Sequence, residues 1–176
     1  SVKLFHSFFQ KEPLITTSAH GRVNLIGEHT DYNNGFVLPS LIPQSLQVSI
    51  SLRDDDKIIG ISREFGELQS SISSSNDGTW LDFVRGAIYF CQKISPSIKG
   101  MEVAVSSSIP SGSGLSSSAA LEIALLRAIT QLKDISIHSQ EIAKIGQQIE
   151  HQFVGTQCGI MDQMASACGT FGQVIL

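Results

Sequence analysis

A serine- and glycine-rich segment is the first place in this sequence where chemistry could sit. It reads Pro-Ser-Gly-Ser-Gly-Leu-Ser-Ser-Ser-Ala-Ala from Pro110 to Ala120, between a strand pattern and a strong helix pattern. Glycines let the backbone approach a ligand, serines supply hydroxyl groups, and the following helix presents unpaired N–H groups to an anion. This composition indicates a phosphate-binding loop, although no Gly-Lys-Ser/Thr of a Walker loop follows. A flexible loop with a serine N-cap is the alternative.

A second polar segment runs from Gly21 to Gly35. Glu28, His29 and Asp31 place two acceptors and a switchable donor within four residues, a set that can bind several hydroxyls of a polyol. Arg22 could pair with a carboxylate or a phosphoryl oxygen. The spacing matches no common metal motif, so we favour polyol binding over metal binding. A polar turn is the alternative, and it explains Arg22, Glu28 and His29 poorly.

Two carboxylates near the end of the chain could also take part in a reaction. Glu150 lies near the end of one expected helix, and Asp162 lies in the first turn of the next. Either could be an ordinary surface acid. Asp162, however, follows an apolar Cys-Gly-Ile-Met stretch, and a helix N-terminus with a nearby arginine would keep it ionised at neutral pH. An ionised carboxylate suits accepting or orienting the proton of a substrate hydroxyl.

The elements that must position these residues follow from hydrophobic periodicity. Alternation of Leu46, Val48, Ile50 and Leu52 with polar residues predicts a half-buried strand, and Ser139 is expected to cap a helix. Helical spacing predicts helices near 2–9, 81–91, 119–132, 139–155 and 160–168. Further strands are expected near 16–26, 57–61, 68–72 and 101–105. The pattern is mixed α and β in one continuous unit, because no linker or repeat divides it.

Composition excludes several classes of protein. The 176 residues are 41% hydrophobic and 16% charged, with a formal net charge of −4, which argues against a disordered chain or a broad nucleic-acid footprint. No apolar run approaches the length of a membrane span, and no signal peptide is recognisable. The three cysteines are odd in number and widely spaced, which predicts a reducing, cytoplasmic setting without a disulfide framework or a zinc finger.

Three segments of the sequence resemble galactokinases, within the galactokinase–homoserine–mevalonate–phosphomevalonate (GHMP) kinase superfamily. They are residues 21–35, 110–120 and 150–163. The serine-rich loop alone indicates only the superfamily. Gly-Arg-Val-Asn-Leu-Ile-Gly-Glu-His-Thr-Asp-Tyr-Asn from Gly21 and Cys-Gly-Ile-Met-Asp-Gln from Cys158 are more specific. The order and spacing of the three segments span most of the chain.

The resemblance implies a reaction and a role for each matching residue. The implied reaction moves the γ-phosphate of ATP to O1 of α-D-galactose, giving galactose 1-phosphate and ADP. Asp162 would be the catalytic aspartate, and Arg22 would hold it ionised and stabilise the transferring group. The residues implied to surround the sugar are Arg22, Glu28, His29, Asp31, Gly159 and Asp162. Those implied to wrap the ATP phosphates are Gly112, Ser113, Gly114, Leu115, Ser116, Ser117 and Ser118, and the implied Mg²⁺ ligands are Ser118 and Glu150.

The implied fold is α+β: the GHMP kinase N-terminal domain, which resembles the second domain of ribosomal protein S5 and has a left-handed βαβ crossover. That domain would fill residues 1–176. A second domain and a later glycine-rich motif would lie beyond this chain, so we expect residues 1–176 alone to be nearly inactive. Compared with the family, His20 replaces a usual proline, and Ser111 and Ser113 replace Leu and Gly.

Two other functions remain open on these residues. One is a kinase for a related sugar, such as N-acetylgalactosamine or arabinose, built on the same motifs. The other is a sensor that binds galactose and ATP without phosphorylating the sugar. Sensors of that kind lack residues just after the serine run, whereas here the run continues unbroken into Ala119 and Ala120. This favours catalysis.

Overall fold

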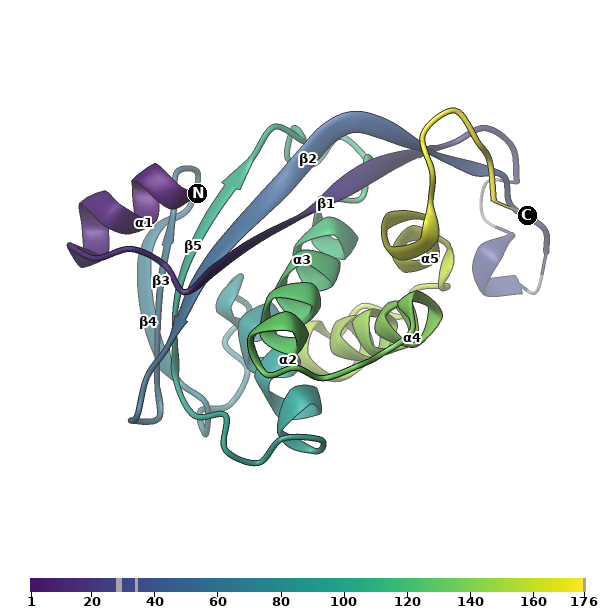
Figure 1. The fold of residues 1–176 in the computed structure, drawn as a ribbon. Coiled ribbons are helices and arrows are strands. Elements are labelled where there is room, and N and C mark those ends of the chain that lie inside the picture. The colour runs from purple at the N-terminus through teal and green to yellow at the C-terminus, as the bar shows by residue number, and fades with distance from the viewer. Residues whose placement is uncertain (28–29, 34, 176) are drawn as a thin grey trace.

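The structure is a computed structural model that describes residues 1–27, 30–33 and 35–175 (Figure 1). The strands are β1 (Ile15–Asn24), β2 (Pro39–Leu52), β3 (Lys57–Ser62), β4 (Gly66–Ser71) and β5 (Met101–Ser107). The helices are α1 (Val2–Phe9), α2 (Leu81–Gln92), α3 (Ser117–Leu132), α4 (Ser139–Ile149) and α5 (Met161–Cys168), with a 3₁₀ turn η1 (Asp31–Asn33) and a π-helical turn η2 (Glu150–Val154).

The five strands of the described residues form one mixed sheet in the order β1-β2-β5-β3-β4. Among these strands only β3 and β5 pair in parallel, and the chain connects them through β4 and α2. The other three neighbouring pairs are antiparallel. The expected α+β class is therefore confirmed, and the parallel pair is the crossover that the family resemblance implies. The left-handed sense of that connection stays a prediction.

Helices α2 to α5 cover one face of the sheet, and α1 lies against the other (Figure 1). Helix α3 is the centre of the first layer, since it contacts β1, β2, α2, α4 and α5. Eleven of its sixteen residues are buried, as its Ala- and Leu-rich sequence leads us to expect. The main core lies between α3 and the inner face of the sheet.

The polar side of β2 is buried at Ser49 and Ser51 and exposed at Gln47, so the expectation of a half-buried strand holds only in part. Ser49 and Ser51 are 0% and 3% exposed. Phe5 of α1, fully buried, helps to cover this face, and the serine hydroxyls find partners there. Ser49 Oγ lies 2.8 Å from Thr16 Oγ1, and Ser51 Oγ accepts the Leu14 N–H at 3.2 Å. The alternation predicts the strand correctly, but it carries no information about α1, the helix that covers part of its polar side.

One helix start differs from the sequence expectation, and a second shows how a residue before the N-cap helps to begin a helix. Helix α4 begins at Ser139 itself with His138 at the N-cap, so Ser139 is not the capping residue. At α2 the N-cap is Trp80, and Thr79 just before it accepts a hydrogen bond from the Leu81 N–H at 3.3 Å. The ends agree better, because α4 runs on through η2 and terminates at Gly155, whose φ of 85° favours glycine.

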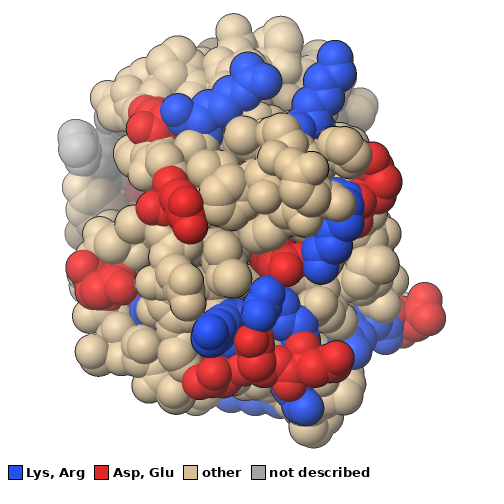
Figure 2. Space-filling model, turned by 90° about the vertical axis from the view of Figure 1, so that its left-hand side faces the viewer, with Lys and Arg blue, Asp and Glu red and all other residues tan. Residues whose placement is uncertain are grey.

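Charged side chains of both signs are interleaved on the face that carries α1 and the β3–β4 hairpin (Figure 2). At the turn between β2 and β3, Arg53 Nε and Nη2 donate to the two oxygens of Asp55 at 2.7 and 2.6 Å. This contact lowers the pKa of Asp55 to about 2. The acidic triplet at residues 54–56 is therefore part of a charged turn. No helix in the described part of the chain is long and apolar enough to cross a membrane.

Replacing Phe5 by alanine should destabilise the protein by about 3 kcal/mol, because the substitution empties a fully buried site between α1 and the sheet. Chemical denaturation monitored by circular dichroism measures this free energy of unfolding. The matched control is Phe36→Ala, since Phe36 is 84% exposed and its loss should change stability by no more than about 0.5 kcal/mol. Equal effects of the two variants would contradict the placement of α1.

Candidate functional site

An ion pair joins the start of the chain to its end. Arg22 of β1 donates from Nε to Asp162 Oδ1 at 2.8 Å, and its Nη2 lies 2.6 Å from the same oxygen. The two residues are 140 positions apart. The Arg22 side chain is 12% exposed and that of Asp162 is 30% exposed, so the pair is partly shielded from water and open on the Asp162 side. The sequence expectation that an arginine lies beside Asp162 is confirmed.

The serine-rich loop docks onto the same arginine. Arg22 Nη1 donates to the Gly114 carbonyl at 2.6 Å, and the Arg22 backbone N–H donates to the Leu115 carbonyl at 3.2 Å. The loop comes this close because residue 21 is glycine: a Cβ there would lie 2.5 Å from the Leu115 oxygen. The pairing of β1 with β2 shifts register at this point, between His20 and Arg22. A local irregularity in β1 therefore admits the loop.

Ser116 links the loop to the carboxylate. Its hydroxyl donates to Asp162 Oδ2 at 2.5 Å, so Arg22 and Ser116 hold different oxygens of one carboxylate. Ser116 has a φ of 61°, in the left-handed region that non-glycine residues seldom occupy, and it is 8% exposed. Strained backbone of this kind concentrates at functional sites. The sequence assigned Ser116 to phosphate binding alone, and nothing in the motif signalled its contact with Asp162.

The rest of the phosphate-loop candidates are open to solvent or lie at the helix start. Gly112 and Gly114 have φ values of 67° and 71°, which the glycines permit, and both are exposed. Ser113, which replaces a family glycine, donates its hydroxyl to the Pro110 carbonyl at 2.6 Å and so stiffens the loop. Ser117 and Ser118 form the first turn of α3, where N–H groups are unpaired by the helix.

Asp31 and Gly159 meet just before the start of α5. A Cβ on Gly159 would overlap the Asp31 carboxyl group, so only glycine permits this approach. The Met161 N–H donates to Asp31 Oδ2 at 3.3 Å. The turn before Gly159 is held from α4 and η2, since Gln147 Nε2 and His151 Nε2 lie 3.1 and 2.9 Å from the Cys158 carbonyl oxygen. Glu28 and His29 lie outside the described residues.

These groups surround a cavity of about 490 Å³. Its wall includes Arg22, Asp31, Ser118, Glu150, Gly159 and Asp162. The structure therefore brings together, from β1, η1, α3, η2 and α5, the described residues that the sequence singled out for sugar, metal and proton chemistry. Its volume is within the range of small-ligand sites.

Two buried carboxyl groups belong to this site, Glu150 in the wall of the cavity and Glu122 outside that wall. Glu122 of α3 is fully buried and Glu150 is 6% exposed. Burial raises the pKa of Glu122 well above its ordinary value, and the charge of Glu150 adds to this. Gln163 Nε2 donates to Glu122 Oε2 at 3.1 Å, whereas Glu122 Oε1 has no hydrogen-bond partner among the described residues. Burial, followed by these carboxylates, raises the pKa of Cys158 to about 12, so its thiol is protonated at neutral pH.

Ser118 and Glu150 fit a magnesium ion by their chemistry. Both line the cavity of about 490 Å³ described above, and they offer one hydroxyl and one carboxylate. Mg²⁺ prefers such hard oxygen ligands and keeps waters or phosphate oxygens in its remaining positions, so a site with few protein ligands is ordinary for it. Within residues 1–27, 30–33 and 35–175 there is no group of three His, Cys, Asp or Glu side chains that could hold a metal alone.

A second cavity of about 540 Å³ adjoins the first. Phe83, Ser118 and Val154 line both, so the two meet at the start of α3. Other residues of its wall include Leu68, Gly78, Thr79, Trp80, Val105, Ile109, Ser111 and Ser117. The sequence does not predict this cavity, because its wall is assembled from segments far apart in the chain, from β2 to η2. Trp80, the only tryptophan, was the available signal.

Two family models match the chain. Residues 82–170 match the GHMP kinases N-terminal domain, and residues 3–52 match the galactokinase galactose-binding signature. The first match contains α2, β5 and the helices α3 to α5, with the serine-rich loop. The second contains β1 and β2, including Arg22 and Asp31.

Solved structures agree with these matches. The galactokinase of Lactococcus lactis, solved with galactose, is 31% identical over 99% of this chain, with a TM-score of 0.84, and 47% of it is covered. A putative sugar kinase of Campylobacter jejuni is 26% identical over 91% of the chain, with a TM-score of 0.73 and 54% of it covered. The Methanococcus jannaschii mevalonate kinase, 22% identical over 87% of the chain with a TM-score of 0.73 and 50% covered, shares the fold.

The chain thus spans about half the length of each of these relatives. The GHMP kinases N-terminal domain model alone matches more than half of the 176 residues. Its matched region carries the loop, the buried helix α3 and the helix start at Asp162 that build the site. The chain belongs to the GHMP kinase family.

Proposed function

We propose that this chain is the ATP- and sugar-binding part of a galactokinase, which transfers the γ-phosphate of ATP to O1 of α-D-galactose. The observation that carries the proposal is the meeting of two cavities at Ser118, with the Arg22–Asp162 pair in the smaller one. Phosphoryl transfer needs two substrates held in line and charge stabilisation between them. The galactose-binding signature over residues 3–52 supports galactose as the acceptor.

In the proposed reaction Asp162 orients the acceptor hydroxyl and takes its proton. Its Oδ1 is held by Arg22, and its Oδ2 accepts only from the Ser116 hydroxyl among the described contacts. Oδ2 is therefore the oxygen that an acceptor hydroxyl would approach, with Ser116 giving way or sharing the carboxylate. Arg22 offsets the charge of Asp162. Its guanidinium lines the same cavity and would stabilise the transferring phosphoryl group there.

The phosphates of ATP would lie along the loop from Gly112 to Ser118, at the N-terminus of α3. The nucleoside would occupy the larger cavity beside Trp80. Ser118 and Glu150 would hold Mg²⁺, which neutralises phosphate charge when bound. On the sugar side, Asp31 and Gly159 face the same space as Asp162, and an ionised aspartate is suited to accept hydrogen bonds from sugar hydroxyls.

A kinase for another sugar is the second candidate. It is favoured by the similarity to the putative sugar kinase of Campylobacter jejuni. Both candidates use the same nucleotide side and differ only in the acceptor. A panel of galactose, N-acetylgalactosamine and arabinose, assayed by ADP release, separates them.

In the full-length protein, Asp162→Asn should lower kcat by at least about 100-fold, because the amide cannot accept the proton of the acceptor hydroxyl. Coupled ADP-release assays measure the rate, and calorimetry should show the affinity for ADP changed less than about threefold. Asp54→Asn, in the exposed β2–β3 turn, is the control and should retain full activity. Wild-type turnover by Asp162→Asn would refute the role of Asp162.

Gly159→Ala should raise KM for galactose by about tenfold or more, because the new methyl group would overlap the Asp31 carboxyl group. KM for ATP should change little. The double variant Asp31→Ala, Gly159→Ala tests the cause: with the carboxyl group gone, the added methyl should cost no more than Asp31→Ala alone. Additive losses would show that Gly159 acts in some other way than through Asp31.

Glu150→Gln should raise the Mg²⁺ concentration needed for half-maximal rate by about tenfold, since the amide is a weaker ligand than the carboxylate. Titration of free Mg²⁺ at fixed ATP gives this value. Glu141→Gln on α4, exposed and paired only with Lys144 among the described ion pairs, is the matched control and should not shift the titration. The same Mg²⁺ curve for wild type and Glu150→Gln would exclude Glu150 as a ligand.

A further inference from the structure

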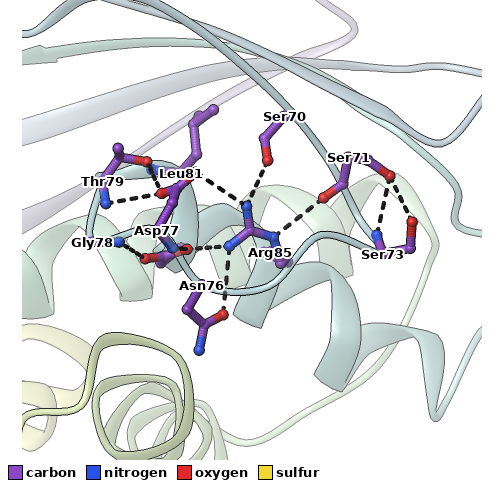
Figure 3. A network of polar contacts seen from close by, with 10 residues as sticks. Ser70, Ser71, Ser73, Asn76, Asp77, Gly78, Thr79, Leu81 and Arg85 are labelled. Carbon is purple, nitrogen blue, oxygen red and sulfur yellow. Dashed lines mark hydrogen bonds and ion pairs between the residues drawn. The ribbon is translucent and has the colours of Figure 1, made fainter.

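A buried arginine takes part in a network of polar contacts that includes residues of the larger cavity (Figure 3). Arg85 of α2 is 2% exposed, and its guanidinium pairs with the carboxylate of Asp82, which is 1% exposed. It also donates from Nη2 to Ser70 Oγ at 2.6 Å and from Nε to the Ser71 carbonyl at 3.2 Å. One side chain therefore fastens α2 to the end of β4.

Asp82 in turn holds the segment that precedes α2. Its Oδ2 accepts the Gly78 N–H at 2.8 Å, and its Oδ1 accepts the Asp77 N–H at 3.4 Å. Gly78 has a φ of 76°, so the backbone turns here in a conformation that favours glycine. Asp77 lies 3.8 Å from Arg85 Nη2 and accepts hydrogen bonds from the Thr79 hydroxyl and N–H. The turn is thus organised around the Asp82–Arg85 pair.

The held turn is part of the cavity wall. Gly78, Thr79, Trp80 and Asp82 all line the larger cavity, whereas Arg85 stands behind them. Residues 73–78 are exposed and belong to no helix or strand, so the sheet does not fix their backbone. Trp80 follows this turn directly, and its ring packs on Gly60 of β3 so closely that a Cβ there would overlap it. Any shift of the turn would move the Trp80 ring or Thr79.

Trp80 also has an unused donor. Its indole nitrogen Nε1 is buried and has no hydrogen-bond partner among the described residues. Buried donors of this kind are uncommon and call for a water or a ligand. Sites that bind a flat heterocycle are typically lined by an aromatic ring and contain a few polar groups that form hydrogen bonds.

We propose that Arg85 is a positioning residue for nucleotide recognition: acting through Asp82 and the turn at residues 77–79, it sets the position of the Trp80 wall against which the base of ATP packs. The proposal rests on the proposed function, because it takes the larger cavity as the nucleoside site. A fully buried ion pair gains little net stability, since desolvation offsets the attraction. Its contribution here is a defined geometry for a turn that has no other regular structure.

The test measures affinity for ADP and GDP by calorimetry in the full-length protein, with Arg85→Lys and Arg85→Met. Lysine keeps the charge but cannot reach Asp82, Ser70 and Ser71 together, because it lacks the planar fork of arginine. We expect both variants to weaken ADP binding by about tenfold and to reduce the preference for ADP over GDP. KM for the sugar should stay within about threefold of the wild-type value, since none of residues 77–82 lines the sugar cavity.

A matched control separates positioning from loss of stability. Arg127 of α3 donates to the backbone carbonyls of Ser18 and Ala167 at 3.0 and 2.9 Å and lines neither cavity. Arg127→Met should lower the melting temperature without changing the ADP-to-GDP preference. All affinities are measured well below each variant's melting temperature.

The outcomes are distinct. If Arg85→Lys and Arg85→Met lower the melting temperature but bind ADP and GDP as the wild type does, Arg85 is structural only and the proposal is wrong. If Arg85→Met fails to fold, the preference for ADP over GDP is measured in Arg85→Lys and in Asp82→Asn, which conserves the shape of the side chain. An unchanged preference in both variants would show that the proposal is wrong. Wild-type protein that binds no ADP would overturn the proposed function, and the role of Arg85 with it.

Discussion

The guanidinium of Arg22 is the contact on which the geometry of the site depends. It touches Asp162 at the start of α5 and the Gly114 carbonyl in the serine-rich loop, and the Arg22 backbone holds Leu115. Two segments far apart in sequence, the loop and the start of α5, therefore take their positions from one residue of an edge strand. The constraint is steric as well as electrostatic, because the loop reaches β1 only where residue 21 has no Cβ. A longer side chain there would separate the loop from the acid that it must face.

The same site contains several features that cost stability. Ser116 adopts a left-handed backbone, Glu122 is buried with an unpaired oxygen, and Glu150 is nearly as deeply buried. Each is unfavourable by itself, by about 1 to 3 kcal/mol for strained backbone or an unsatisfied buried group. The extensively buried helix α3, packed on the sheet and on three other helices, is rigid enough to hold them. The stability of the core therefore offsets the unfavourable backbone of Ser116 and the burial of the two glutamates.

The sequence predicted those features that are local in the chain. The helices from α1 to α5 follow from periodicity, and the motif residues Arg22, Asp31, Gly159 and Asp162 do converge on one cavity. What the sequence could not predict depends on partners from elsewhere in the chain. The burial of Ser49 comes from α1 on the far face, and the Trp80 cavity is assembled from segments that range from β2 to η2. Hydrophobic periodicity predicts neither feature, because it identifies only the apolar face that an element buries and not what covers its other face.

Under the proposed function the site has a nucleotide side and a sugar side. The nucleotide side, with α2, the loop and α3, lies mostly within the region that matches the GHMP kinase model, whereas the sugar side combines Arg22 and Asp31 of the galactose-binding signature with Gly159 and Asp162 of the GHMP kinase match. The two sides meet at Phe83, Ser118 and Val154, so phosphoryl transfer would have to pass this boundary. A change of acceptor sugar therefore requires new contacts near Asp31 and Gly159 and leaves the nucleotide wall untouched. A change at the Asp82–Arg85 pair acts on the opposite side and leaves the Arg22–Asp162 pair in place. This separation explains how one fold can combine a shared phosphate loop with different acceptors.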